Sequence, residues 1–452
     1  MRDDRGFRSG VIEGFYGRPW SEGQRLALFE RMRVWGLDTY VYAPKDDVKH
    51  RALWREPYDD GELARLTRLV ESASERGLRF VYALAPGLDL RFAEARDAAH
   101  LRAKIEQVLG LGVRDVALLF DDVPRTLSDD DRARYGTLAA AQADAANRLH
   151  GLLTEPGGGA LLFCPTDYCA AMARPRPADS PYLRELGERL EPTIEVLWTG
   201  PEVVSEAIEV EHVRQVAAVL RRKPLLWDNL HANDYDLRRV YLGPYAGRPS
   251  ELRAEVSGIL ANPNTEAAAN AVPLATLAAY LKAGPYEPRR AFLEAVAAWA
   301  RDLEGVGSEG VAGEGISADD LAFVADFHYL PFEHGAAARA FLDDVAYLSV
   351  TPPAAWGDTF AAVVAAVRRL ADVAGRLERV RDRELAASLS PYLRDVLAEA
   401  GRAARVLERR RRGAPWEAPR DGVGNTDGRA FADELRALLP APSRARPPGS
   451  GG

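Results

Sequence analysis

Residues 115–123 read DVALLFDDV, a short apolar run that ends abruptly at two adjacent carboxylates. Runs of this kind, rich in β-branched or aromatic residues and closed by a polar, Gly- or Pro-bearing stretch, recur over residues 10–264. Most are followed by a segment with helical periodicity, and this alternation is typical of α/β proteins. The other runs begin at Gly10, Thr39, Leu78, Ala160, Glu195, Pro224 and Val256. Because eight parallel strands close a barrel, we predict a (β/α)8 TIM barrel.

The segments between these runs are amphipathic, and the first of them begins at Ser21, which has capping-box spacing to Gln24. After about residue 284 the β-rich runs cease, and Ala, Leu, Arg and Glu recur with helical periodicity. We therefore predict a catalytic barrel domain over residues 1–284 and an all-α helical bundle over residues 285–439. The Pro, Ser and Gly content of residues 440–452 predicts a disordered tail.

The composition is that of an ordinary globular protein, with 47% hydrophobic and 28% charged residues and a formal net charge of -8. A negative protein is poorly suited to a phosphate backbone, so we expect no nucleic-acid partner. Residues 1–10 lack the apolar core of a signal peptide, and no run of about 20 apolar residues occurs, so we expect no membrane association and a cytoplasmic location. Cys164 and Cys169 are too few for a disulfide framework or a zinc site, and we expect two buried thiols.

Polar and aromatic residues follow most of the predicted strands, at the end of the barrel where TIM-barrel enzymes carry their chemistry. They are Gly14, Phe15 and Tyr16; Lys45, Asp46 and Asp47; Asp121 and Asp122; Asp167 and Tyr168; Trp227, Asp228 and Asn229, with Asn233 and Asp234 beyond; and Asn262. Carboxylates, carboxamides and aromatic rings are the groups that bind sugars. Only one histidine, His231, lies near these strand ends, so we expect neither a metal nor another cofactor.

Asp121 and Asp122 are the sharpest feature of this set. Two neighbouring carboxylates in an apolar mouth cannot both ionise without cost, so we expect one to shift toward the protonated form that a general acid needs. A helix N-cap or a solvated turn is the alternative. Consecutive strand residues point to opposite faces, so the pair is poorly placed to flank a sugar as in ordinary glycosidases. A substrate whose own 2-acetamido oxygen is the nucleophile removes that requirement.

The chain resembles glycoside hydrolase family 84, the O-GlcNAcases and related bacterial β-N-acetylglucosaminidases. The resemblance lies in the stretches GVIEGFYGRPWS, YVYAPKDDVKHRALWREPY, ALLFDDV, FCPTDYC, EVLWTGPEVVS, LLWDNLHANDYD, LGPY and LANPN. It extends from about residue 8 to residue 284 and resumes at DLAFVADFHYLPFEHG. The resemblance implies a retaining exo-hydrolase that removes terminal β-linked N-acetylglucosamine (GlcNAc) by substrate-assisted catalysis through an oxazoline.

The same resemblance implies roles for single residues. Asp121 would orient the acetamido N–H and stabilise positive charge while the carbonyl oxygen attacks the anomeric carbon. Asp122 would protonate the departing oxygen and then activate the water that opens the oxazoline. The implied acetamide pocket is formed by Tyr168, Trp227 and Asn229, and the implied hydroxyl binders are the Gly14 backbone, Lys45, Asp234 and Asn262. For Tyr16 and His231, packing is an equally good explanation.

The expected partner is a GlcNAc-bearing glycoprotein, glycopeptide or saccharide, and the sequence leaves the choice between them open. One alternative is a hydrolase of hyaluronan or of peptidoglycan fragments with the same mechanism. Another is a glycan-binding protein without activity. The resemblance further implies that the helical domain can form a homodimer, and a loose similarity suggests the hypothesis that Tyr392 approaches a substrate.

Overall fold

The computed structural model describes residues 6–154, 158–282, 284–305, 316–380, 382–416 and 430–439. The chain divides into two compact units. The barrel unit comprises Met1–Leu237 and Pro244–Ala291, and the helical unit comprises Arg238–Gly243 and Phe292–Gly452. The predicted domain boundaries stay predictions, and the tail predicted over residues 440–452 lies outside the described residues.

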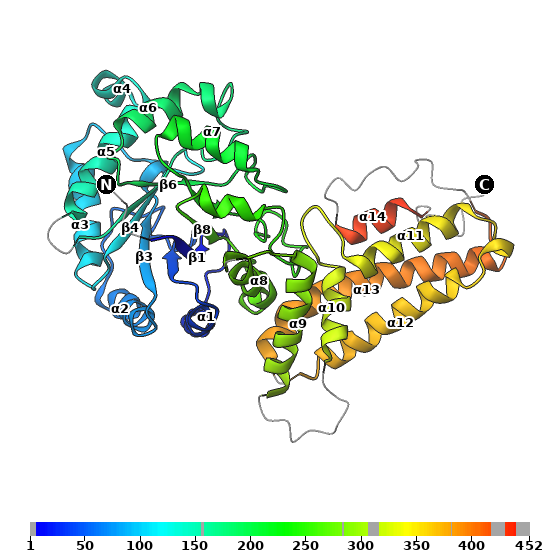
Figure 1. Ribbon diagram of the computed structural model, residues 1–452. Helices are drawn as coiled ribbons and strands as arrows, with labels where there is room; N and C mark the ends of the chain where they lie inside the picture. Colours follow the sequence, from blue (N-terminus) through cyan, green and yellow to red (C-terminus); the bar gives the residue numbers. More distant parts are fainter. Residues whose placement is uncertain are drawn as a thin grey trace, which may run out of the picture. The chain divides into compact units, whose positions relative to one another are not determined.

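The barrel unit contains a closed barrel of eight parallel strands, each hydrogen-bonded to its neighbours in chain order (Figure 1). The strands are β1 (Arg8–Glu13), β2 (Thr39–Tyr42), β3 (Arg79–Leu84), β4 (Asp115–Leu119), β5 (Leu161–Cys164), β6 (Glu195–Trp198), β7 (Leu225–Asp228) and β8 (Gly258–Ala261). Seven strands fall within apolar runs predicted from the sequence, and β1 begins two residues before its run, which starts at Gly10. The predicted TIM barrel is confirmed.

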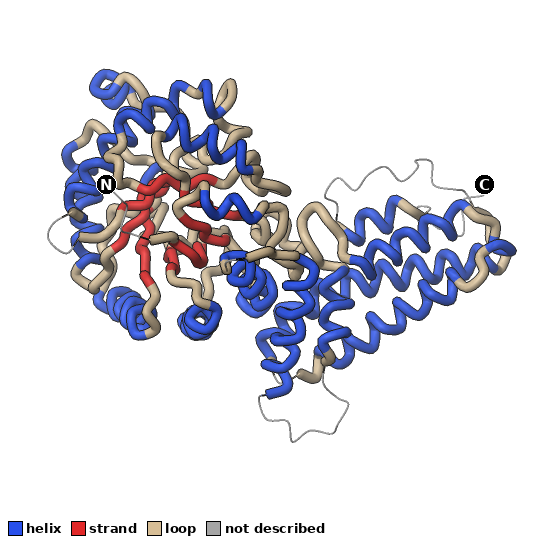
Figure 2. The backbone as a smooth tube through the Cα atoms, in the orientation of Figure 1, coloured by secondary structure: helices blue, strands red, loops and turns tan. Residues whose placement is uncertain are grey.

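Helices surround the strands of this unit (Figure 2). They are α1 (Glu22–Trp35), α2 (Asp60–Glu75), α3 (Ala95–Leu109), α4 (Asp129–Tyr135), α5 (Leu138–Leu153), α6 (Pro181–Arg189), α7 (Val210–Leu220) and α8 (Ala271–Leu281). The capping box predicted for the first helix is present, since the Gln24 N–H donates to Ser21 Oγ at 3.2 Å and the Ser21 N–H to Gln24 Oε1 at 2.6 Å. The local sequence therefore determines where α1 begins.

The inside of the barrel is packed with apolar side chains such as Val81, Leu119, Leu162 and Leu225, all fully buried. A fully buried carboxylate, Glu13, ends β1. It accepts hydrogen bonds from the Trp20 N–H at 3.0 Å, from Arg25 Nε and Nη2 at 2.8 and 2.7 Å, and from the Tyr40 hydroxyl. These bonds anchor the exit of β1, where Gly14 follows.

The helical unit is built from α9 (Pro288–Gly305), which begins just before the division, α10 (Ala318–Asp326), α11 (Ala336–Val350), α12 (Thr359–Leu377), α13 (Arg383–Arg411) and α14 (Phe431–Ala437). Phe327, Phe341 and Phe431 pack together, with ring centroids 4.8 to 6.2 Å apart. This confirms the predicted helical region after the barrel. None of the helices in the described ranges is long and apolar enough to cross a membrane.

Candidate active site

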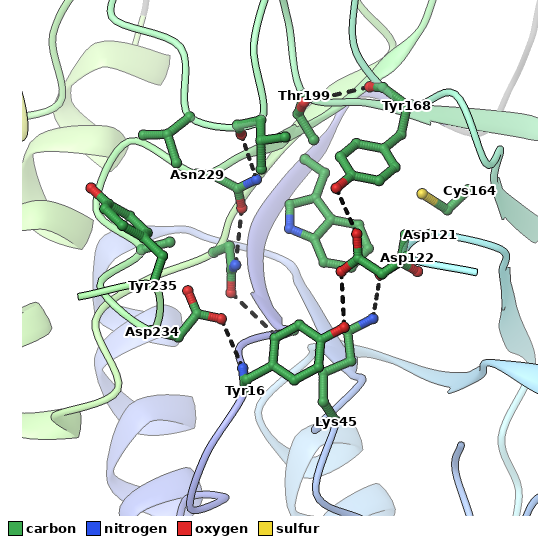
Figure 3. Close-up of a pocket in the computed structure, with 16 residues that line it drawn as sticks. Tyr16, Lys45, Asp121, Asp122, Cys164, Tyr168, Thr199, Asn229, Asp234 and Tyr235 are labelled. Carbon is green, nitrogen blue, oxygen red and sulfur yellow. Dashed lines mark hydrogen bonds and ion pairs between the residues drawn. The ribbon is translucent and has the colours of Figure 1, made fainter. Parts of the chain in front are cut away.

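A cavity of about 450 Å³ lies at the carboxyl ends of the barrel strands (Figure 3). All nine residues that the sequence analysis assigned to the site line it: Gly14, Lys45, Asp121, Asp122, Tyr168, Trp227, Asn229, Asp234 and Asn262. Tyr16, for which packing was an equal explanation, lines it as well. These residues meet because closing the barrel brings six separate strand exits to one opening.

Asp121 is buried beside Lys45, with 2.5 Å between Oδ2 and the lysine Nζ. Burial by itself would raise the pKa of Asp121, but the Lys45 ammonium, together with Arg51, outweighs it and holds that pKa below its ordinary value. Its other oxygen, Oδ1, is also buried and has no hydrogen-bond partner among the described residues. Asp121 is therefore an ionised carboxylate that can accept one more hydrogen bond from a group bound in the cavity.

Asp122 has a left-handed backbone, with φ of 51°. Aspartate is among the few residues other than glycine that adopt this conformation at modest cost. β4 ends at Leu119, so the two acids lie on a turn beyond the strand and the alternation of faces does not apply to them. The turn explains how neighbouring carboxylates line one cavity. The alternative of a helix cap is wrong, because the next helix, α4, is capped by Ser128.

Three side chains hold Asp122, which is itself exposed. The Tyr16 hydroxyl donates to Oδ2 and the Tyr168 hydroxyl to Oδ1, each at 2.8 Å (Figure 3). Arg51 Nη2 donates to the main-chain oxygen of Asp122 at 3.1 Å. Burial, followed by the Asp122 carboxylate, raises the pKa of both tyrosines, so both remain protonated donors at neutral pH.

The cavity wall opposite the two acids contains a chain of hydrogen-bonded amide groups. The Gly14 N–H donates to Asn262 Oδ1 at 3.3 Å, Asn262 Nδ2 donates to Asn229 Oδ1 at 2.9 Å, and Asn229 Nδ2 donates to the Val203 carbonyl at 2.7 Å. A Cβ on Gly14 would lie 2.4 Å from Cζ2 of Trp227, so only glycine lets this ring pack where it does. These hydrogen bonds fix both carboxamides in orientations set by residues far apart in the sequence.

Asp234 completes the lining near Tyr16, whose N–H donates to Asp234 Oδ2 at 2.8 Å. Burial raises the pKa of Asp234, and the bond from the Tyr16 N–H opposes that shift in part. Through its backbone and its hydroxyl, Tyr16 thus joins Asp234 to Asp122.

Other residues at the strand ends lie outside the cavity lining and have structural partners. Phe15 packs on Trp20, Asp47 accepts from the Tyr42 and Tyr58 hydroxyls, Asp167 pairs with Arg125, Asp228 pairs with Arg248, and Asn233 donates to Glu266. Asp46 is exposed and His231 is buried, and neither lines the cavity. Tyr392 is buried in the helical unit with its ring beside His328, and its approach to a substrate stays a prediction.

Six further residues line the cavity that were not predicted from the sequence: Cys164, Thr199, Val203, Val204, Ala232 and Tyr235. Cys164 is the last residue of β5, so its position at a strand end was a usable signal. It is free and buried, as predicted for a small thiol, and burial raises its pKa well above the ordinary value. Val203 and Val204 carry no polar group and follow β6 in a loop, so their only signal was the family stretch EVLWTGPEVVS that contains them.

A sequence model of a family described as beta-N-acetylglucosaminidase matches residues 9–308. The chain belongs to this family. The chain is 48% identical over 278 residues to a protein called Protein O-GlcNAcase from Mus musculus and to its counterpart from Rattus norvegicus. These alignments cover 62% of this chain and 30% of each relative, so the chain spans less than a third of their length.

A solved structure of a mutant O-GlcNAc hydrolase from Thermobaculum terrenum is also similar. It has a TM-score of 0.74 at 31% sequence identity, over 89% of this chain and 83% of that chain. The structural similarity therefore extends beyond residues 9–308, which the family model matches. Membership of the β-N-acetylglucosaminidase family places the chain among the glycoside hydrolases and confirms the resemblance seen in its motifs.

Proposed function

We propose that the protein is a retaining exo-β-N-acetylglucosaminidase that uses the substrate's acetamido oxygen as nucleophile. One observation carries the proposal: a buried Asp121 paired with Lys45 and an exposed Asp122 line the same cavity from adjacent positions on a left-handed turn. Acids placed side by side cannot act from opposite faces of a sugar ring, as a nucleophile and an acid of the protein must. They can serve a substrate that supplies its own nucleophile.

In the first step, Asp121 accepts the acetamido N–H through its unpartnered Oδ1. This bond orients the carbonyl oxygen toward the anomeric carbon, and the negative charge stabilises the positive charge that develops as the oxazoline forms. Lys45 keeps Asp121 ionised for this task. Asp122 gives a proton to the departing oxygen, and in the second step removes a proton from the water that opens the oxazoline. Two displacements at the anomeric carbon retain the β configuration.

The remaining lining residues divide between the two ends of the sugar. Tyr168, Trp227 and Asn229 form the acetamide pocket, where the aromatic rings provide apolar walls and the carboxamide a polar group. The Gly14 backbone, Lys45, Asp234 and Asn262 bind the sugar hydroxyls. This assignment uses groups of both hydrogen-bonding types, because Lys45 donates, Asp234 accepts and Asn262 can do either.

We further propose a GlcNAc-bearing protein or glycopeptide as the substrate, supported by the relatives named Protein O-GlcNAcase and O-GlcNAc hydrolase. A cytoplasmic location and a homodimer through the helical unit belong to the same proposal. Hydrolysis of GlcNAc-modified peptides should be compared with hydrolysis of short GlcNAc saccharides and hyaluronan fragments. Preference for a saccharide or for hyaluronan would replace this substrate class and leave the chemistry intact.

The mechanism is tested by Asp122→Asn with aryl β-GlcNAc substrates whose leaving groups differ in acidity. General acid catalysis contributes about 10²- to 10⁴-fold, so we expect a loss of that size for poor leaving groups and a much smaller loss in cleavage of an activated one. Asp130→Asn, an exposed residue of α4, is the matched control and should behave as wild type. Full activity of Asp122→Asn on every substrate would refute the assignment, as would failure of a GlcNAc-derived thiazoline to bind the wild-type protein.

A further inference from the structure

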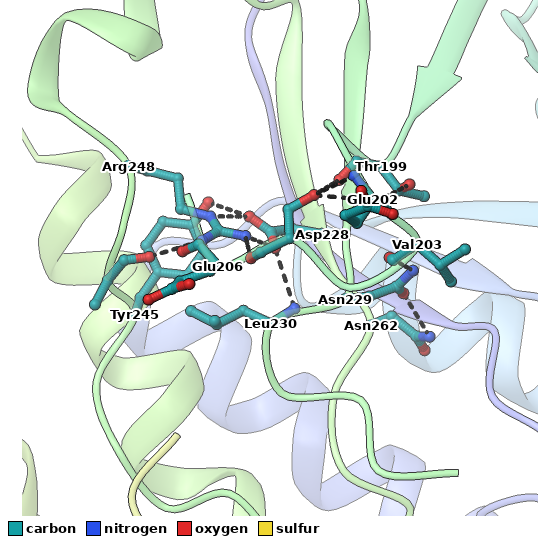
Figure 4. A network of polar contacts seen from close by, with 12 residues as sticks. Thr199, Glu202, Val203, Glu206, Asp228, Asn229, Leu230, Tyr245, Arg248 and Asn262 are labelled. Atoms are coloured by element: carbon teal, nitrogen blue, oxygen red, sulfur yellow. Dashed lines mark hydrogen bonds and ion pairs between the residues drawn. The ribbon is translucent and has the colours of Figure 1, made fainter. Parts of the chain in front are cut away.

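A fully buried ion pair between Asp228 and Arg248 lies outside the lining of the cavity (Figure 4). Asp228 is the last residue of β7 and directly precedes Asn229, which does line it. The pair is bidentate, with Arg248 Nε 2.8 Å from Oδ2 and Nη2 2.7 Å from Oδ1 of Asp228. Two charges without exposed surface are costly unless each is fully hydrogen-bonded, so the other partners matter.

Arg248 uses all five of its N–H groups. Beyond the two bonds to Asp228, Nη1 donates to the carbonyls of Glu206 and Ala246 and Nη2 to that of Ser205, each at 2.9 Å. The guanidinium therefore joins the end of β7 to the segment around Ser205 and Glu206. A lysine has three donors and no planar fork, and cannot satisfy the same set.

Asp228 is equally well satisfied. Its Oδ2 also accepts from the Tyr245 hydroxyl at 2.7 Å and its Oδ1 from the Leu230 N–H at 3.1 Å. Burial by itself would raise the pKa of Asp228, but Arg248 outweighs it and holds that pKa below its ordinary value. The carboxylate thus remains charged and bound to the guanidinium.

Ser205 and Glu206 lie between β6 and α7, in a stretch of which we call residues 199–206 the β6 exit loop. Thr199, Val203 and Val204 of this loop line the cavity. The loop is folded tightly on itself, because Ser205 Oγ donates to the Thr199 carbonyl and accepts from the Glu202 N–H, both at 3.1 Å. Fixing Ser205 therefore fixes the cavity wall.

Two contacts tie this wall to the proposed acetamide pocket. The Thr199 N–H donates to the Tyr168 carbonyl at 2.9 Å, and Asn229 Nδ2 donates to the Val203 carbonyl at 2.7 Å. On the other side of the loop, Gly247 lies so close that a Cβ there would be 2.1 Å from the Glu206 carbonyl. The segment that carries Arg248 is thus pressed directly against the β6 exit loop.

We propose that Arg248, held by Asp228, is a positioning residue that sets the size of the pocket for the 2-acylamino group. It does so by fixing the β6 exit loop against Asn229 and the end of β7. The inference rests on the proposed function, since it concerns how that pocket discriminates between substrates. Because a wall displaced by about 1 Å can cost about 100-fold in rate, the effect should be measurable.

The test compares Arg248→Lys with a matched buried arginine at the amino ends of the strands. Arg8, the first residue of β1, is 2% exposed and pairs with Asp115 and Glu195, which begin β4 and β6. Arg8→Lys should lower stability without changing substrate selectivity, because that end of a TIM barrel serves stability. Each folded variant is assayed on aryl β-glycosides of N-acetyl- and N-butanoylglucosamine, well below its unfolding temperature.

For Arg248→Lys we expect kcat/KM on the N-acetyl substrate to fall about 10- to 100-fold, chiefly through a higher KM. We also expect the ratio of kcat/KM for N-acetyl over N-butanoyl to change by at least about threefold, since one methylene in a fixed pocket is worth 10-fold or more. Arg8→Lys should keep the wild-type ratio. A purely structural role of Arg248 would leave its ratio at the wild-type value as well.

Ser205→Ala is the second variant, in case Arg248→Lys does not fold. It removes the hydroxyl that bonds Thr199 and Glu202 and leaves no buried charge, and it should also move the ratio away from the wild-type value. Wild-type ratios in every folded variant at Arg248 and Ser205 would overturn the positioning role. The proposed function is judged separately, by whether the wild-type protein hydrolyses the N-acetyl substrate at all.

Discussion

Gly14→Ala should damage the proposed sugar pocket while leaving Asp121 and Asp122 in place. The added Cβ would lie 2.4 Å from Cζ2 of Trp227, and Cβ contacts closer than 3.0 Å essentially do not occur, so the ring must retreat by about 0.6 Å or more. Trp227 is 5% exposed and belongs to the apolar core of the barrel, so it has little room to move. Overpacking of this kind typically costs about 1 to 3 kcal/mol.

If that cost falls on the ligand-bound state, affinity should drop about 5- to 150-fold. Calorimetric titration with a GlcNAc-derived thiazoline and kcat/KM on an aryl β-GlcNAc substrate would measure the loss. The matched control is Gly23→Ala in α1, where the nearest atom to an added Cβ is Ser21 Oγ at 4.0 Å. This variant should bind and turn over as wild type. Wild-type affinity in Gly14→Ala would show that Trp227 does not form a wall of the pocket.

Lys45→Met removes the charge that opposes burial at Asp121, so the pKa of Asp121 should rise. In the wild type this carboxylate is ionised at pH values above its ordinary pKa, and it protonates only when the pH falls through its lowered pKa. The acid limb of the pH profile of kcat/KM should therefore move to higher pH in Lys45→Met. It should stay in place in Lys45→Arg, which keeps the positive charge. An unchanged acid limb in Lys45→Met would mean that Asp121 is not the group that titrates there. Ser21→Ala deletes the N-cap of α1, a residue that does not line the cavity, and should lower the free energy of unfolding of the barrel unit by about 1 kcal/mol. Denaturant unfolding checks this, and a change in kcat/KM would contradict the purely local role of the cap.

Each strand of the barrel was predictable because the sequence pattern that indicates it lies within the strand itself. A run of β-branched and aromatic residues such as residues 39–42 favours a strand wherever it is placed, and the capping box at Ser21 requires only Gln24, three residues away. The polar ends of these runs could be assigned to one site because closure of a parallel barrel brings all carboxyl ends of the strands to one opening.

The parts of the site that only the tertiary structure determined depend on contacts between distant segments. The left-handed turn at Asp122 is held in part by Tyr16, 106 positions earlier in the chain, and no pattern within residues 115–123 predicts its φ. The same holds for the wall at Val203, which carries no polar signal and owes its position to Arg248 and Asn229. The sequence by itself determined the barrel and the chemical groups at its opening, because those follow from local propensity and strand order. The orientation of the two acids and the shape of the pocket were decided by hydrogen bonds that form only once the barrel has closed.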